Sequence, residues 1–95
     1  MAESTARSSI TSQRAEIDRI DAELIELFNR RAECALAIGR VKKTNNEPVH
    51  VPAREQQVLE RALALNRGPL SAEAIGRLFR GLFEEMRRLE ETLNS

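Results

Sequence analysis

The chain has 95 residues, which is enough for one domain, and a core built by this chain alone would be small. Fifteen Lys and Arg residues balance fifteen Asp and Glu residues, so the formal net charge is zero. This balance argues against nucleic-acid binding, which normally shows a basic excess gathered on one face. No apolar run approaches the roughly 18 residues of a membrane span, and the polar start MAESTARSSITS is not expected to be a secretory signal.

The residue types indicate a helical protein without a metal centre. A single cysteine, Cys34, cannot form an internal disulfide or a metal cluster, and we expect a reducing, cytoplasmic location. The apolar residues are mostly Leu, Ile, Ala and Val at helical spacing, and no alternating strand pattern runs for more than a few residues. The sequence therefore predicts an all-α fold.

The N-terminal half of the chain predicts one long helix. Residues 1–11 are small, polar and aperiodic, which predicts a flexible tail in front of a helical domain over residues 12–95. From about Ser12 a helical apolar pattern continues to Lys42, giving a helix of some 30 residues and about 45 Å. A globule of this size, with a radius of gyration of about 12–13 Å, cannot cover such a rod. We therefore expect a second copy of the chain to cover it, in a homodimer.

Two shorter helices are predicted to follow. Residues 44–50 have turn chemistry, and Pro52 suits the first turn of a helix whose apolar stripe runs to Leu65. Residues 66–69 end that helix, and Ser71 is a candidate N-cap for the third helix. The third helix carries its apolar residues at helical spacing: Ile75, Leu78, Phe79, Leu82, Phe83, Met86 and Leu93.

Ionisable side chains lie on the expected packing faces of all three helices. In the first helix, Arg31 and Lys42 fall within about 20° of the line along its apolar face. In the second helix, Arg54 and Glu55 extend the apolar stripe, and in the third helix Glu90 lies about 20° from the apolar line. The other charged residues, Arg80 and Arg87 among them, are expected on solvated faces. Charges in a core need partners, because burying them unpaired costs several kcal/mol each.

Three cations against two carboxylates leave a positive surplus on these faces. A surplus of guanidinium and ammonium groups in an apolar cavity suits a small polyanion. We therefore predict an internal pocket for an organic acid, lined from all three helices. The alternative interpretation is that these charges form buried ion pairs, or reach the solvent from the edge of the apolar stripe.

Arg14 differs from these residues. It lies about 80° off the apolar line of the first helix and some 25 Å from Arg31 along the helix axis. It therefore cannot serve the same pocket as Arg31 within one chain. In an antiparallel dimer, however, Arg14 can reach the pocket of the neighbouring chain.

Four motifs in the chain resemble those of the all-helical chorismate mutases. They are R-x-x-I-D-x-I-D-x-E-L-I-x-L-x-x-R-R at residues 14–31, G-x-x-K at residues 39–42 and P-V-x-x-x-x-R-E at residues 48–55. The run G-P-L-S-x-E-x-I-x-R-L-F-R at residues 68–80 resembles the same domain where it is fused to prephenate dehydratase. The similarity covers roughly residues 12–92.

The resemblance implies an intertwined homodimer of three-helix subunits with two equivalent active sites. Members of the family convert chorismate to prephenate, in phenylalanine and tyrosine biosynthesis, by a Claisen rearrangement with no cofactor and no covalent intermediate. By position, Arg31 and the partner subunit's Arg14 would bind the substrate carboxylates, with Arg54 assisting. Glu55 would hold the ring hydroxyl of the substrate.

The resemblance further implies that Arg31, Lys42 and Glu90 are catalytic. Lys42 would hydrogen-bond the ether oxygen and a carboxylate oxygen, and Glu90 would face the ether oxygen from the opposite side. The family often has Gln in place of Glu90. Because an ionised Glu cannot donate a hydrogen bond, we predict that Glu90 is protonated in the active complex. Some members carry polar groups at the positions of Val51 and Met86, which we include among the substrate-binding candidates.

Two other functions remain open from the sequence. The same scaffold hosts isochorismate pyruvate lyases, which use a similar cationic pocket on an isomeric substrate; the similarity at residues 68–80 favours the mutase. The third possibility is a non-enzymatic helical dimerisation module with buried structural ion pairs.

Overall fold

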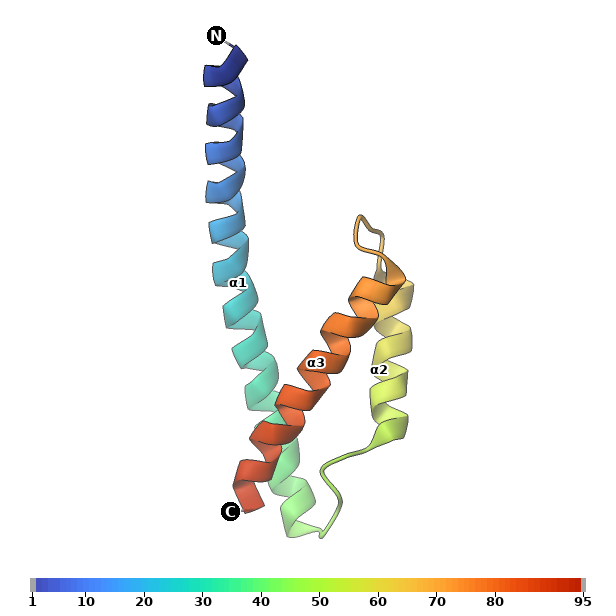
Figure 1. Ribbon diagram of the computed structural model, residues 1–95. Helices are drawn as coiled ribbons and strands as arrows, with labels where there is room; N and C mark the ends of the chain where they lie inside the picture. The colour runs from blue at the N-terminus through green and yellow to red at the C-terminus, as the bar shows by residue number, and fades with distance from the viewer. Residues whose placement is uncertain (1, 95) are drawn as a thin grey trace. The chain divides into compact units, whose positions relative to one another are not determined.

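The computed structural model describes residues 2–94, with side chains for residues 7–94. Three α-helices follow one another, α1 (Ala2–Thr44), α2 (Pro52–Leu65) and α3 (Ala72–Glu91), and a 3-10 turn, η1 (Thr92–Asn94), comes after α3 (Figure 1). No strand occurs within residues 2–94, so the prediction of an all-α chain with three helices is confirmed. The residues fall into two units, Met1–Arg31 and Ala32–Ser95, which are described in turn.

The start of α1 differs from the prediction. The apolar pattern placed the start near Ser12, behind a tail over residues 1–11, but α1 begins at Ala2. The predicted start is therefore wrong: residues 2–11 contain no Gly or Pro, and a helix that already exists extends through them without a new nucleation step. The flexibility of this segment stays a prediction. Met1 and Ser95, the outer ends of the predicted tail and domain, lie outside the described residues.

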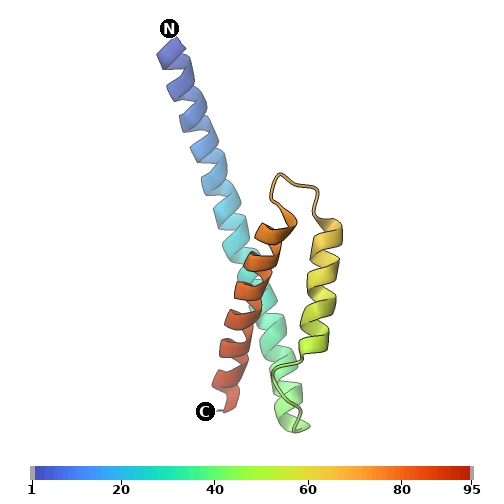
Figure 2. The ribbon, with the colours of Figure 1, turned by 45° about the vertical axis from the view of Figure 1, so that its right-hand side comes forward.

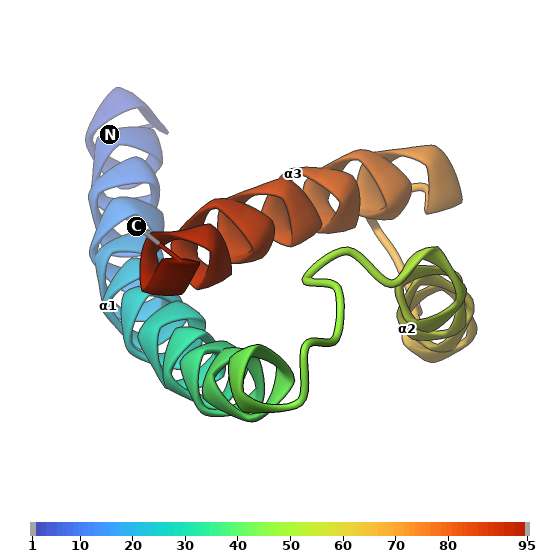
Figure 3. The ribbon, with the colours of Figure 1, turned by 90° about the horizontal axis from the view of Figure 1, so that it is seen from below.

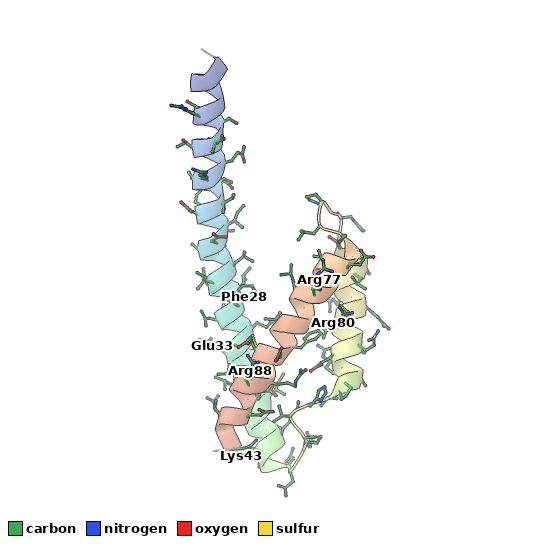
Figure 4. The ribbon with its side chains drawn as sticks, viewed as in Figure 1. Phe28, Glu33, Lys43, Arg77, Arg80 and Arg88 are labelled. Carbon is green, nitrogen blue, oxygen red and sulfur yellow. The ribbon has the colours of Figure 1, made fainter. Side chains whose placement is uncertain are left out.

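The first unit consists of α1 up to Arg31, and its apolar stripe is exposed. Six of the large apolar side chains on it are between 41% and 53% exposed: Ile10, Ile17, Ile20, Leu24, Leu27 and Phe28. Phe28 is labelled in Figure 4. A surface helix gains most of its stability from packing such an apolar face, which in this unit is left exposed.

In the second unit, α2 and α3 pack against each other and lie side by side in Figures 1 and 2. α2 begins at Pro52, and its C-cap residue is Asn66, whose backbone N–H donates to the carbonyl of Ala62. The N-cap residue of α3 is Ser71, whose hydroxyl accepts a hydrogen bond of 3.1 Å from the N–H of Ala74. The predicted proline start and serine cap are therefore both confirmed.

A short connection leads from the end of α1 to α2, and Figure 3 lets it be followed over residues 45–51. Asn46 turns the chain with a left-handed φ of 56°. The N–H of Glu47 then donates to the carbonyl of Lys42 at 2.8 Å. This turn brings the residues after Glu47 back towards the last turn of α1.

The buried part of the second unit is small. Ala35 and Phe83 are its buried apolar side chains among the described residues, and the rings of Phe79 and Phe83 meet edge to face at 6.1 Å between centroids. This agrees with the expectation that the chain alone builds only a small core.

Gly39 marks a close approach between the last turns of α1 and the end of α3. A Cβ added at this buried glycine would lie 2.9 Å from Leu93 Cδ1 and 3.3 Å from Glu90 Cγ. Lys43 also reaches across from α1, and its Nζ donates to the carbonyl of Leu93 (Figure 4). The missing side chain at residue 39 therefore fixes how closely Glu90 approaches α1.

We predict that Gly39→Ala gains less free energy of unfolding than Gly81→Ala. Ala is favoured over Gly in a helix interior by about 1 kcal/mol at both positions. Among the described residues, a Cβ at Gly81 meets nothing within 4 Å, whereas a Cβ at Gly39 meets Leu93 and Glu90. The shift of these side chains should cancel most of the gain at Gly39.

The two variants should be compared by urea unfolding at one chain concentration. Gly81→Ala serves as the matched control, since it changes helix propensity without adding a close contact. Equal gains in the two variants would contradict the close approach at Gly39.

Candidate active site

Lys42 and Glu90 lie near each other where α3 approaches the last turn of α1. Lys42 Nζ is 4.0 Å from Glu90 Oε2, and the two side chains are only 17% and 10% exposed. Lys42 Nζ also donates a 3.0 Å hydrogen bond to the backbone carbonyl of Val49. The connection between α1 and α2 thus holds the ammonium group in place, on the side of the unit where Glu90 is buried.

Glu55 lies in the first turn of α2 and forms a part-buried ion pair with α3. Arg87 Nη1 donates to Glu55 Oε2 at 2.5 Å, and the two side chains are 29% and 25% exposed. His50 Nε2 lies 3.5 Å from the other carboxylate oxygen, Oε1. Acidic residues in a first turn are also favoured by the helix dipole.

An open hollow of about 400 Å³ lies between α2 and α3. Glu55 and Arg87 line its polar side, Leu59 and Phe83 its apolar side, and Arg80 also borders it. Arg80 is labelled on α3 in Figure 4. Glu55 is the predicted site residue that contributes to this hollow.

Three further candidates of the second unit lie on α2 and α3. Val51 is the N-cap residue of α2 and is half-buried, as is Met86 on α3. Arg54 is exposed, and its Nη1 donates to Gln57 Oε1 at 2.7 Å on the same helix. In the single chain, its guanidinium group is therefore held on the surface of α2.

The remaining two candidates, Arg14 and Arg31, belong to the first unit. Arg14 is exposed and Arg31 is half-buried. Both lie on α1, where a rise of about 1.5 Å per residue puts them some 25 Å apart. The helix therefore keeps the two guanidinium groups well apart within one chain.

Arg87 was not among the predicted site residues. We expected this arginine on a solvated face, but it is part-buried and bridges two helices that lie far apart in the sequence. The helical spacing from Phe83 and Glu90 on α3, both buried, places Arg87 between them on the packing side. That spacing was the available signal.

In the second unit, the Lys42 ammonium group is a hydrogen-bond donor with little exposure to solvent. An ammonium group with little solvent exposure can donate hydrogen bonds to an oxygen that gains negative charge, and these bonds are stronger where water is excluded.

No group of three or more His, Cys, Asp or Glu side chains in the described part of the chain is placed to hold a metal ion. Across the same residues, no helix combines the length and the apolar character needed to cross a membrane.

Comparison with known proteins finds relatives that include bifunctional enzymes and a separate chorismate mutase. Two bifunctional chorismate mutase/prephenate dehydratases are similar, from Neisseria gonorrhoeae (47% identity over 77 residues, 81% of this chain) and Aquifex aeolicus (39% over 84 residues, 84% of this chain). The chain spans only 21% and 23% of their lengths. An intracellular chorismate mutase from Mycobacterium tuberculosis is 43% identical over 61 residues, which are 64% of this chain and 58% of that protein.

Solved structures agree with these relatives. A chorismate mutase from Thermus thermophilus superimposes with a TM-score of 0.85 at 34% identity, covering 86% of this chain and 93% of that one. The chorismate mutase of Helicobacter pylori in complex with prephenate gives a TM-score of 0.84 at 33% identity, covering 90% and 92%. The family model described as chorismate mutase type II matches residues 13–91. The chain therefore belongs to the type II chorismate mutase family.

Proposed function

We propose that this chain converts chorismate to prephenate by a Claisen rearrangement. The observation that carries the proposal is the poorly exposed pair of Lys42 and Glu90, which the α1–α2 connection and the close approach at Gly39 hold together. Family membership and the similarity to an enzyme that binds prephenate support it. We also propose a cytoplasmic location, since the Mycobacterium tuberculosis relative is an intracellular enzyme.

The reaction makes modest demands on the protein. One ether C–O bond breaks and one C–C bond forms within a single molecule, so no nucleophile or proton transfer is required. The protein has to hold the substrate in a compact, chair-like conformer and to place donors at the ether oxygen, where negative charge grows. Lys42 would donate to that oxygen from one side, and a protonated Glu90 from the other.

The substrate is a dicarboxylate, and its charges need cations. In our proposal, Arg31 binds one carboxylate and the partner subunit's Arg14 binds the other, with Arg54 turning from Gln57 to assist. Glu55 accepts a hydrogen bond from the ring hydroxyl. Val51 and Met86 complete the substrate-binding surface with apolar contacts.

The proposed active form is an intertwined homodimer. The exposed apolar stripe of the first unit and the small core of the second both favour a second copy of the chain as the covering surface. A dimer would also solve the problem posed by Arg14, which lies too far along α1 to serve the same pocket as Arg31.

The proposal is tested by the loss of chorismate absorbance with purified chain, followed by identification of prephenate as the product. Isochorismate should be run in parallel with a coupled assay for pyruvate. Pyruvate release from isochorismate without turnover of chorismate would replace the mutase with a lyase. Turnover of neither substrate would favour the helical dimerisation module.

We predict that Lys42→Met lowers kcat/KM for chorismate by about a hundredfold or more. Loss of a donor to a developing oxyanion costs on the order of 3 kcal/mol of transition-state stabilisation. Steady-state kinetics measures this loss. Arg40→Met is the matched control: it removes an exposed cation on the same helix, and its kcat/KM should stay within about twofold.

The same pair of variants separates an enzyme from a dimerisation module. In a module with structural ion pairs, Lys42→Met should leave thermal stability unchanged or raise it, since replacing a buried ion pair with apolar groups is often neutral or stabilising. An unchanged kcat/KM in Lys42→Met would contradict the proposed role of this lysine.

We predict that kcat falls as pH rises, and that Glu90→Gln flattens this dependence. Only a protonated Glu90 can donate to the ether oxygen, and this form is lost as pH rises. A Gln amide donates at every pH. The measurement is kcat between about pH 5.5 and 8 for both proteins. Glu91→Gln, at the exposed neighbour, should keep the original profile, and an unchanged profile in Glu90→Gln would contradict the protonated state.

We predict that Arg14→Ala and Arg31→Ala are each nearly inactive but restore activity when mixed. In a mixed dimer, one site combines the intact Arg31 of one chain with the intact Arg14 of the other. Random mixing should therefore recover about a quarter of the original activity, given a symmetric dimer. The two variants are unfolded and refolded together, then assayed against each variant refolded alone. Absence of any recovery would contradict a site shared between chains.

A further inference from the structure

We propose that Arg87 is a positioning residue, which holds Glu55 in the orientation that receives the ring hydroxyl of the substrate. This inference rests on the proposed function, because Glu55 has a substrate to meet only if the chain binds chorismate. It adds a residue on α3 that the family motifs do not include. Arg87 itself would not touch the substrate.

The contact between Arg87 and Glu55 is the first support. Nη1 of Arg87 lies 2.5 Å from Oε2 of Glu55, and the pair connects α3 to the first turn of α2. Both side chains are more than two thirds covered, at 29% and 25% exposure. A charge-assisted hydrogen bond between two packed helices fixes a side chain far better than a bond between neighbouring turns in open solvent.

Arg88 shows the contrast on the same helix. It is 62% exposed, and it donates to Glu84 at 2.7 Å and to Glu85 at 2.5 Å, both within one turn. Such pairs contribute little to stability and connect no other element. The two adjacent arginines of α3 therefore differ in kind: Arg87 reaches another helix, whereas Arg88 stays on its own.

The second support for the inference comes from the contacts that each oxygen of the Glu55 carboxylate makes. Arg87 occupies Oε2, and Oε1 lies 3.5 Å from His50 Nε2, at an imidazole that is 54% exposed. Each carboxylate oxygen accepts about two hydrogen bonds, so the carboxylate keeps acceptor sites for a hydroxyl donor.

The hollow between α2 and α3 gives Glu55 little other support. It is lined by Leu59 and Phe83 on its apolar side, and by His50, Arg80 and Glu84 besides the pair itself. Glu84 is already bound by Arg88. Without Arg87, the Glu55 carboxylate would share this hollow with a second carboxylate and lose the bond that selects its rotamer.

The inference has a kinetic signature. The ring hydroxyl takes no part in the bonds that break and form, so Glu55 binds it equally in the ground state and in the transition state. Loss of such uniform binding raises KM and leaves kcat nearly unchanged. We therefore expect Arg87→Met to raise KM for chorismate by about tenfold, with kcat within about twofold.

The experiment compares four proteins with chorismate as substrate: the unsubstituted chain, Arg87→Met, Arg87→Lys and the control Arg88→Met. Arg87→Lys keeps the charge without the guanidinium fork, and should recover most of the lost affinity. Arg88→Met should keep KM and kcat within about twofold. An unchanged KM in Arg87→Met, with turnover by the unsubstituted chain, overturns the inference alone.

A double-mutant cycle with Glu55→Ala distinguishes positioning from a purely structural role. If Arg87 acts through Glu55, Arg87→Met should raise KM no further in the Glu55→Ala background, where no acceptor is left to position. A further rise of about tenfold there would overturn the inference, since Arg87 would then act by another route. If Arg87→Met does not fold, Arg87→Gln with and without Glu55→Ala gives the same comparison. Absence of turnover by the unsubstituted chain contradicts the proposed function itself.

Discussion

The second unit depends on the close approach of the end of α3 to α1 at Gly39. A side chain at this position would meet Leu93 and Glu90, so the absence of one lets a carboxyl group come within 4.0 Å of the Lys42 ammonium group. The cost is a glycine in a helix interior, about 1 kcal/mol relative to alanine. The glycine thereby lets two ionisable groups lie together where little water reaches them. Hydrogen-bond donors act most strongly on developing charge where water is scarce.

Hydrogen bonds from one element to another hold the side chains of the candidate site in place. The carbonyl of Val49 accepts from Lys42, so the connection before α2 fixes the ammonium group, while Arg87 fixes Glu55 from α3. The adjacent arginines on the same helices, Arg54 beside Glu55 and Arg88 beside Arg87, make only local pairs. Contacts between elements transmit the packing of the unit to the carboxylates and the ammonium group, whereas local pairs do not.

Features of the fold and the site that depend on the chemistry of single residues could be predicted from the sequence. Pro52 and Ser71 mark helix starts through their own backbone and side-chain preferences, so their places were predictable. The start of α1 was not, because polar residues without Gly or Pro carry no stop signal once a helix exists. Helical periodicity places Arg87 on the packing side of α3, but its pairing with Glu55 depends on how α2 packs against α3, which periodicity along one element does not contain.

The exposed stripe on α1 connects stability with catalysis in the proposed dimer. Few described side chains are buried in the single chain, so in the proposed dimer much of the apolar burial would come from covering residues such as Leu24 and Phe28. The surface that supplies this burial would be the same surface that carries Arg14 to the neighbouring pocket. Dilution of the chain would then remove stability and complete active sites together, since a dimer's folded state depends on protomer concentration. A dimer in which Arg14 had no part in the site could lose activity only through unfolding.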